Sequence, residues 1–239
     1  MSRIYRKPLL SLNRFLAKTL FNEIQKSESA VIVAVVSQKG GVGKSSLSRT
    51  LSVEFTRAGW KVLLADIDAS QITSNRWAEK RRNAAGILPQ IETVVYPMAA
   101  LAIEASKGYD LTVIDGAPHA TQGTFDAATA ADLVVIPTGS SMDDLEPSVM
   151  LARELAESLN SEKIVFALYK TTSDAQERES RETLSSFGFD VLEGAVPVRT
   201  GYIDAFDRGF CATETKYDNL NQVAGVLIKS ISERLKGVR

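Results

Sequence analysis

Seven apolar runs of strand length recur along the chain, and segments with the spacing of helices lie between them. Most of these runs are almost wholly apolar, which is typical of strands that are buried on both faces of a parallel sheet. The runs are Val31–Val36, Val62–Ala65, Ile91–Val95, Leu111–Ile114, Leu133–Ile136, Ile164–Leu168 and Val191–Val196. Strands that alternate with helices predict an α/β fold with a doubly wound, mostly parallel sheet and helices on both of its faces.

The expected helices lie between these runs, and one more closes the chain. They are Lys44–Ala58, Ser74–Asn83, Ala99–Lys107, Gln122–Ala131, Asp143–Asn160, Ala175–Phe187 and Asp218–Lys236. In sheets of this kind, ligands bind beyond the carboxyl ends of the strands. We therefore look for functional residues directly after the apolar runs.

The first 29 residues differ from the rest of the 239-residue chain. Apolar residues recur there at three- and four-residue spacing, with basic and amide side chains on the other side; they are Leu9, Leu12, Leu16, Leu20 and Ile24. This pattern predicts an amphipathic helix and a short linker over residues 1–29, followed by one domain over residues 30–239. Packing on its own domain, docking or dimerisation, and binding to an anionic membrane surface all remain open for this extension.

Composition excludes several classes of protein. The chain is 44% apolar and its formal net charge is −1, so it carries no overall basic field and would need a local patch or an assembly to bind nucleic acid. No apolar run of about 18 residues predicts a transmembrane helix. The single cysteine, Cys211, excludes an intramolecular disulfide and a CxxC metal site, which is in keeping with a cytoplasmic protein.

A glycine-rich stretch with two lysines, Lys39 and Lys44, follows the first apolar run. Glycines allow the main chain to come close to a ligand, and successive amide groups there can bind phosphate oxygens. A helix that begins near Lys44 adds the positive end of its dipole. We expect Lys44 to reach the β- and γ-phosphates of a nucleotide and the Ser45 hydroxyl to bind Mg²⁺.

The stretch departs from the general pattern GxxxxGK[ST], because Gln38 stands at the position of the first glycine. Residues 39–45, KGGVGKS, instead resemble the deviant Walker A motif, KGGxGK[ST], of the ParA/MinD family of ATPases. The resemblance implies that ATP is the nucleotide. Its contacts would come from Lys39, Gly40, Gly41, Val42, Gly43, Lys44, Ser45 and Ser46. It also implies that Lys39 reaches across a homodimer interface to the phosphates bound by the other subunit, which would couple ATP binding to dimerisation.

Acidic residues follow two of the later runs, at Asp66-Ile-Asp68 and at Asp115. An acid at the carboxyl end of a strand beside a phosphate loop can hold Mg²⁺, usually through water. The resemblance makes Asp68 the residue that orients the attacking water, places Asp66 behind it, and makes Asp115 the Walker B aspartate. The family pattern DxDPQ is not kept, since Ala69 replaces the proline, so we expect the first switch segment to differ in shape.

Two later segments extend the resemblance over about residues 30–239. Residues 131–137, ADLVVIP, are similar to a family strand, and Gly194-Ala-Val-Pro197-Val-Arg199 is similar to a late family segment. By this analogy the loops near Lys170 and Pro197 border the adenine. Tyr169 stands near the position of a family asparagine, and it would either stack on the base or pack at the end of its strand.

The resemblance implies a ParA-like ATPase for plasmid or chromosome partition. Its ATP-bound homodimer would bind DNA without sequence preference on the nucleoid, and a ParB-like centromere-binding partner would stimulate a slow hydrolysis. The candidate DNA contacts are Arg199, Arg208, Lys216 and Lys229, with Arg76, Lys80, Arg81, Arg82, Arg234 and Lys236 as further basic residues. A MinD-like ATPase that cycles on a membrane and a nucleotide-dependent scaffold for DNA transfer with little turnover remain as alternatives.

Overall fold

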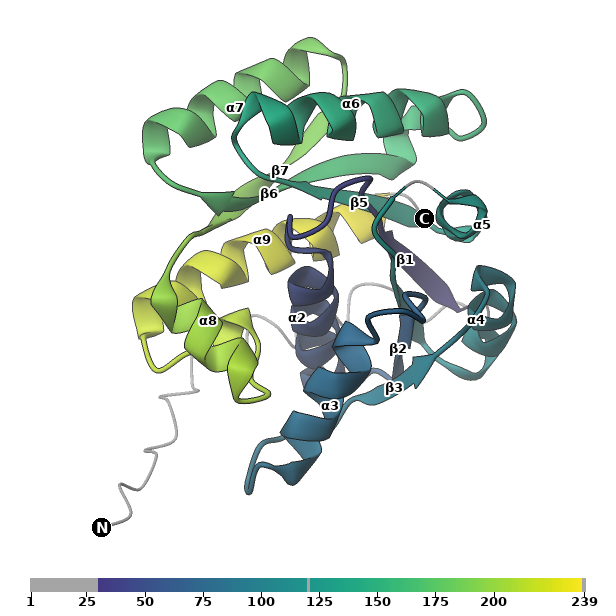
Figure 1. The fold of residues 1–239 in the computed structure, drawn as a ribbon, viewed down its shortest axis with the longest axis vertical. Helices are drawn as coiled ribbons and strands as arrows, with labels where there is room; N and C mark the ends of the chain where they lie inside the picture. Colours follow the sequence, from purple (N-terminus) through teal and green to yellow (C-terminus); the bar gives the residue numbers. More distant parts are fainter. Residues whose placement is uncertain (1–29, 120, 238–239) are drawn as a thin grey trace.

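The structure is a computed structural model that describes residues 30–119 and 121–237, so the expected helix in residues 1–29 lies outside the described residues. One seven-stranded sheet runs through the domain in the order β3-β2-β4-β1-β5-β6-β7 (Figure 1). Its strands are β1 Val31–Val35, β2 Val62–Asp66, β3 Glu92–Val95, β4 Leu111–Asp115, β5 Leu133–Thr138, β6 Ile164–Thr171 and β7 Asp190–Pro197. All neighbouring strands pair in parallel, which confirms the predicted sheet.

Helices cover both faces of the sheet, as predicted. They are α2 Lys44–Arg57, α3 Thr73–Asn83, α4 Ala99–Ala105, α5 Gln122–Ala130, α6 Met142–Ala156, α7 Asp174–Ser186, α8 Thr200–Asp207 and α9 Asp218–Gly237, with the short 3-10 helices η1 Ser106–Gly108, η2 Ser161–Lys163 and η3 Ala212–Glu214. No helix in the described part of the chain has the length and apolar character that crossing a bilayer requires.

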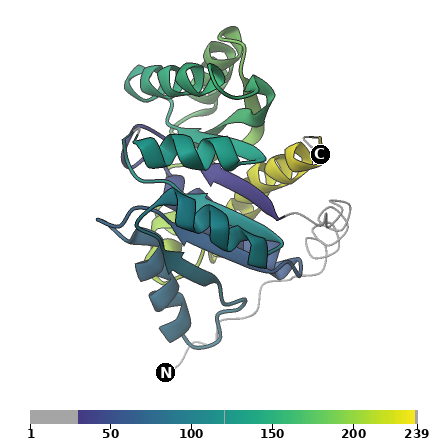
Figure 2. The same cartoon turned by 90° about the vertical axis from the view of Figure 1, so that its right-hand side faces the viewer.

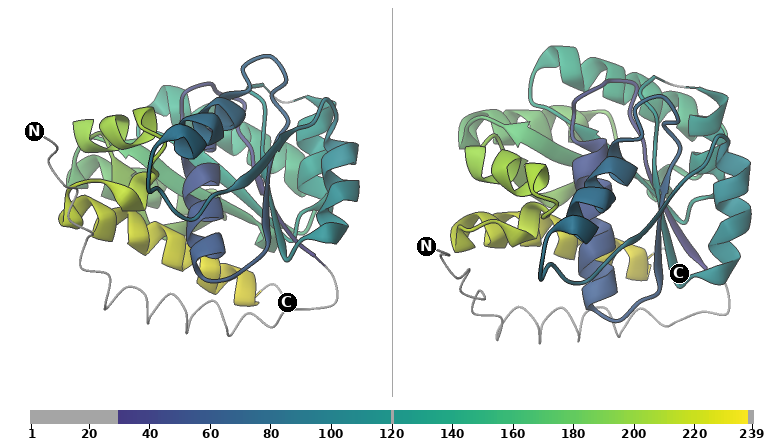
Figure 3. Two further views of the ribbon diagram at one scale, coloured as in Figure 1. Left: turned by 90° about the horizontal axis from the view of Figure 1, so that it is seen from below. Right: turned by 60° about the horizontal axis from the view of Figure 1, so that its bottom comes forward.

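The core consists of two apolar layers, one on each face of the sheet. Successive strand residues point to opposite faces, so Val33 joins the layer under α2, α3, α8 and α9, whereas Ala34 joins the layer under α4, α5, α6 and α7. Figure 2 looks onto the second set of helices, and Figure 3 shows α8 and α9, in lime and yellow, on the opposite side of the sheet from α4 in teal. Because both layers bury the inner strands, these strands read as continuous apolar runs, whereas the edge strands β3 and β7 keep exposed polar residues.

Helix α8 was not among the expected helices. It has eight residues and contains Gly201, so its sequence shows neither the length nor the composition of a typical helix. Its packing explains the glycine, because a Cβ atom on Gly201 would stand 2.8 Å from side-chain atoms of Tyr217 and Leu220. Tyr202 fixes the same contact by donating a hydrogen bond to the backbone carbonyl of Leu220 at 2.8 Å.

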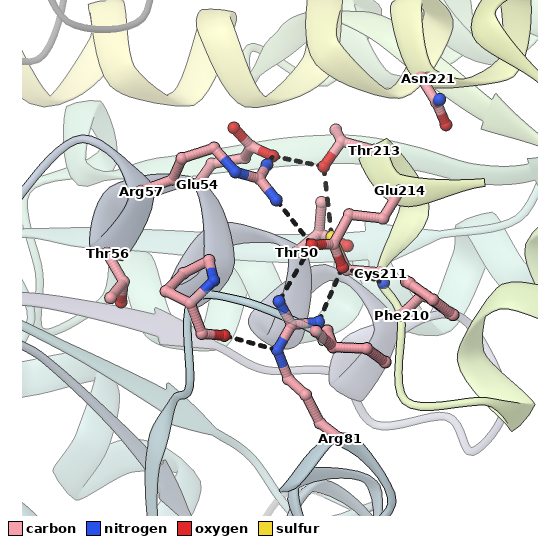
Figure 4. A network of polar contacts seen from close by, with 12 residues as sticks. Thr50, Glu54, Thr56, Arg57, Arg81, Phe210, Cys211, Thr213, Glu214 and Asn221 are labelled. Carbon is pink, nitrogen blue, oxygen red and sulfur yellow. Dashed lines mark hydrogen bonds and ion pairs between the residues drawn. The ribbon is translucent and has the colours of Figure 1, made fainter. Parts of the chain in front are cut away.

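A buried ionic cluster joins α2, α3 and η3, and Figure 4 shows two arginines that converge on Glu214. The Arg81 side chain is completely buried and lies 2.7 Å from Glu214, while Arg57 approaches the same carboxylate at 2.6 Å. Arg81 also donates to the carbonyl oxygens of Pro89 and Gly209. Burial alone would raise the pKa of Glu214, but hydrogen bonds and charge from Arg81 and Arg57 lower it overall. The suggestion that Arg81 contacts DNA is therefore wrong, since its guanidinium is fully used inside the domain.

Candidate phosphate-binding site

The glycine-rich loop joins β1 to α2 and ends where the helix begins. Gly43 precedes Lys44 with φ 106°, and Gly41 has φ 78°, values that favour glycine strongly. Gly43 also lies against the ring of Tyr169, so that a Cβ atom there would stand 2.7 Å from Cγ of that ring. Backbone conformation and close packing therefore both require glycine at this position.

The carboxyl ends of three neighbouring strands meet beside this loop. Val35 of β1 pairs with Asp115 of β4, which in turn pairs with Asp66 of β2. Both carboxylates are 1% exposed, so two groups of like charge lie side by side in the interior. Burial first, and the charge of Asp115 second, raise the pKa of Asp66 to about 6. The pKa of Asp115 is also raised by burial, which outweighs the hydrogen bond from Ser74.

A hydrogen-bond network from two helices holds these carboxylates. Ser74, in the first turn of α3, donates its hydroxyl to Asp115 at 2.6 Å and its backbone amide to Asp66 at 2.9 Å. The Ser74 hydroxyl accepts from Nε of Arg49 on α2 at 3.1 Å. Arg49 is buried and opposes the negative charge of the pair. The start of α3 is therefore tied directly to the strand-end acids.

Trp77, further along α3, also contacts neighbouring elements of the domain. Two guanidinium groups lie near its indole ring, that of Arg49 at 5.7 Å and that of Arg81 at 5.4 Å from the ring centre. The indole nitrogen donates to the carbonyl of Phe210 at 2.8 Å. Helix α2, which follows the glycine-rich loop, therefore packs together with helix α3, which follows the Asp68 segment, and with the segment after α8.

Lys44 brings positive charge to the same place. Its Nζ donates to the carbonyl of Lys39 at 2.8 Å, which folds the side chain back along the loop. Burial lowers the pKa of Lys44, and the charges of Asp115 and Asp68 partly oppose that change. The structure thus brings together Lys44, Asp68 and Asp115, which the sequence had placed in three separate segments.

The carboxylate of Asp68 is held by the residues that follow it, in the segment that departs from the family pattern DxDPQ. One oxygen of its carboxylate accepts hydrogen bonds from the Ser70 hydroxyl at 2.6 Å, the Ser70 amide at 3.2 Å and the Gln71 amide at 3.1 Å. The backbone amide of Asp68 donates to Asp66 at 3.0 Å. Ser70 therefore fixes the orientation of this carboxylate by engaging one of its two oxygens.

Lys39 points away from the loop's own cradle. Its Nζ lies 2.6 Å from Oδ1 of Asp144 at the start of α6, and the side chains are 39% and 24% exposed. Ser141 donates to the other oxygen of Asp144 at 2.8 Å. Burial raises the pKa of Asp144, but the hydrogen bonds from Lys39 and Ser141 lower it overall. An exposed ion pair of this kind contributes about 1 kcal/mol or less, so it holds Lys39 without locking it.

The residues expected near the base have different surroundings. Tyr169 is 4% exposed and belongs to the core under α2, an environment in keeping with packing at the strand end, and its contact with a base remains a prediction. Pro197 ends β7 and is half-buried. Its contact with a base remains a prediction.

The four candidate DNA contacts are exposed, and they lie on different helices and connecting segments. Arg199 precedes α8 and Arg208 follows it, Lys216 lies between η3 and α9, and Lys229 lies within α9, 3.5 Å from Glu233. The packing of Gly201 on Tyr217 brings the start of α8 to the start of α9. A role in DNA binding remains a prediction for all four.

Sequence reasoning missed Asp144, Ser74 and Arg49. Asp144 stands in the first turn of a helix, where an acid normally complements the helix dipole and so carries no signal of its own. Ser74 is a residue type that is common at the start of a helix. Arg49 stands between Ser48 and Thr50 on α2, so its surroundings in the sequence are those of an ordinary helix arginine and give no signal of a buried acidic partner.

The donor set of the site fits Mg²⁺. Hydroxyl and carboxylate oxygens are the ligands this hard cation prefers, and Ser45 and Asp115 supply them, since Ser45 is close enough to Asp115 to help lower the pKa of that carboxyl. Asp66 and Asp68 lie on the neighbouring strand end. Phosphate and water would complete the coordination of such an ion.

Comparison with known proteins gives a family and several relatives. The sequence profile of the CobQ/CobB/MinD/ParA nucleotide binding domain matches residues 33–210. The chain is 28% identical over 152 residues to the chromosome-partitioning ATPase Soj of Thermus thermophilus, a match that covers 52% of this chain and only 61% of Soj. It is 24% identical over 213 residues to the chromosome partitioning protein ParA of Caulobacter vibrioides, covering 70% of this chain and 80% of that protein.

A solved structure has the same fold. The septum site-determining protein MinD from Pyrococcus horikoshii, complexed with Mg-ADP, superposes with a TM-score of 0.62 at 21% sequence identity. The match covers 85% of this chain and 95% of that chain. At this level of identity the likeness concerns the fold.

Proposed function

The chain belongs to the CobQ/CobB/MinD/ParA family of nucleotide-binding domains, and from this premise we propose that it is a ParA-like, Mg²⁺-dependent ATPase of DNA partition. ATP binding closes two subunits face to face, and the dimer binds DNA without sequence preference. A partner protein of the ParB type, bound to a plasmid or chromosome, stimulates hydrolysis and release. The protein acts in the cytoplasm on the nucleoid. The names of the relatives Soj and ParA support this assignment.

The observation that carries the proposal is the position of Lys39. The side chain of Lys44 already lies along the loop of its own subunit, where its Nζ donates to the carbonyl of Lys39. The ammonium group of Lys39 instead contacts Asp144, outside the loop, and the Lys39 side chain is 39% exposed. A cation held weakly at the rim is free to be delivered to a triphosphate in a second subunit, where it neutralises developing charge.

Each remaining residue of the site has a role in this proposal. The loop amides and Lys44 bind the phosphates, and Ser45 and Asp115 hold Mg²⁺, which would neutralise the charge of the β- and γ-phosphates. Asp68 orients the attacking water through the carboxylate oxygen that Ser70 and Gln71 leave unbound. Because its other oxygen is fixed in a turn, we expect hydrolysis to be slow until a partner reshapes this segment.

The deciding experiment is a gel shift on random-sequence DNA with ATP, with ADP and without nucleotide, over a series of salt concentrations. We expect binding with ATP alone, and binding that falls steeply with salt, because phosphate contacts release counterions. Lys39→Ala should abolish the ATP-dependent shift, whereas Lys107→Ala, an exposed lysine paired with Glu104 at a distance from the loop, should leave it unchanged. Equal binding in the three nucleotide states would overturn the proposal.

A further inference from the structure

A second lysine, Lys170, is presented at the phosphate loop by an unusual backbone. It lies near the end of β6 with φ 59°, in the left-handed region that costs a non-glycine residue about 1–2 kcal/mol. The pairing of β6 with β7 shifts register between Tyr169 and Thr171, so Lys170 is the residue of a bulge. Bulges beside functional sites commonly redirect a side chain.

The redirected side chain ends beside the loop. Nζ of Lys170 lies 3.9 Å from the point that a Cβ atom on Gly41 would occupy. Within the part of the chain that the structure describes, the side chain of Lys170 makes no hydrogen bond or ion pair. Its charge nevertheless reaches Asp144, whose pKa it helps to lower after the larger effects of Lys39 and Ser141. Asp144 therefore has two ammonium groups near it, one bound and one uncommitted.

The uncommitted group matters when Lys39 leaves. In the proposed dimer, Lys39 must give up its 2.6 Å contact with Asp144 to reach the other subunit. Asp144 is three-quarters buried and would then keep only the Ser141 hydroxyl and the start of α6. A carboxylate that loses its cation in a partly buried place opposes the movement.

We propose that Lys170 is the replacement counter-ion of Asp144, which takes the place of Lys39 when that lysine crosses to the partner subunit. Lys170 is then a positioning residue: it acts through Asp144, and it makes the release of Lys39 less costly in each subunit of the dimer. The inference rests on the proposed function, because it needs Lys39 to cross. It explains why the chain keeps a lysine in a strained backbone at this point.

The test is a double-mutant cycle on dimerisation, measured by analytical ultracentrifugation with a saturating non-hydrolysable ATP analogue. Lys170→Asn removes the charge and tolerates the left-handed backbone, which asparagine adopts readily. We expect the dimer to weaken about fivefold to tenfold, since one ion pair of modest strength is lost in each of the two subunits. Lys170→Arg should restore it, and Lys107→Asn, which removes the same charge at a distance, should not change it.

Asp144→Asn is the second mutation of the double-mutant cycle. In that background there is no carboxylate to compensate, so Lys170→Asn should have no further effect on the dimer. The affinity of each monomer for ADP should be equal in wild type and in Lys170→Asn.

Three results overturn the inference, and they are distinguishable. If wild type dimerises but Lys170→Asn does so equally well, the inference fails and the proposed function stands. If Lys170→Asn weakens the dimer in the Asp144→Asn background, or weakens ADP binding, Lys170 acts on the phosphates directly and not through Asp144. If wild type does not dimerise with the ATP analogue, the proposed function fails and the inference fails with it.

Discussion

Replacing Gly43 by alanine tests the site at its most constrained point. Alanine at φ 106° lies outside the regions that residues with a Cβ atom adopt, at a cost of about 1–3 kcal/mol. The new methyl group would also stand 2.7 Å from Cγ of Tyr169, inside the core, where overpacking costs about 1–3 kcal/mol. Partial relaxation leaves about 3 kcal/mol against the observed loop, which corresponds to about 100-fold weaker ATP binding.

The assay is a titration with a fluorescent ATP analogue, accompanied by thermal unfolding. Gly59→Ala is the matched control: Gly59 has φ 97°, but a Cβ atom there meets nothing within 4 Å and the residue lies beyond the far end of α2. It should cost stability without changing ATP affinity. Adding Tyr169→Ala to Gly43→Ala removes the clash and should recover only part of the affinity, because the backbone strain remains. ATP affinity within threefold of wild type for Gly43→Ala would refute this reasoning.

Three further predictions concern buried and paired acids. Glu214→Gln should lower the free energy of unfolding by about 3 kcal/mol in urea, because the fully buried Arg81 loses its anion while Arg57 keeps Glu54, whereas exposed Glu104→Gln should change it little; equal effects would contradict the role of the cluster. Because the folded pKa of Asp66 is raised to about 6, its contribution to stability is present at low pH and lost as the pH rises from about 4 to about 6. Urea unfolding across this range should show the free energy of unfolding of wild type falling by about 2–3 kcal/mol relative to that of Asp66→Asn. If the stability of the two proteins changed with pH in parallel, the raised pKa of Asp66 would be excluded. Asp144→Asn should tighten the ATP-dependent dimer about tenfold by releasing Lys39, as sedimentation would show; a weaker dimer would mean that the contact does not oppose crossing.

Much of the fold follows from local patterns in the sequence. A strand buried on both faces needs a continuous apolar run, so Val31–Val35 and Leu133–Thr138 are recognisable without knowledge of their neighbours. The glycine-rich loop and the acids at strand ends could be placed together in advance, because parallel strands present their carboxyl ends at one edge. These inferences needed only chain order and periodicity.

The rest depends on contacts between distant segments, which no local pattern encodes. The Lys39–Asp144 pair spans 105 residues and forms because β5 lies beside β1 in the sheet, so that α6, which follows β5, begins near the loop that follows β1. The burial of Tyr169 depends on how closely Gly43 approaches β6. In the same way, Arg81 has the sequence context of a surface arginine, and its burial depends on the ion pair with Glu214, which lies 133 residues later in the chain.

The two tryptophans of this chain give it a built-in optical reporter. Trp60 packs edge-on against Phe55 near the C-terminal end of α2, whereas Trp77 lies on α3, with the guanidinium groups of Arg49 and Arg81 at 5.7 Å and 5.4 Å from its ring centre. Emission from an indole is sensitive to nearby charge, so any shift of α3 on nucleotide binding should change the fluorescence of Trp77 and leave that of Trp60 nearly constant. A Trp60→Phe variant would isolate that emission, and a stopped-flow trace on mixing with Mg²⁺ and ATP would then time the first step of the cycle without an attached dye.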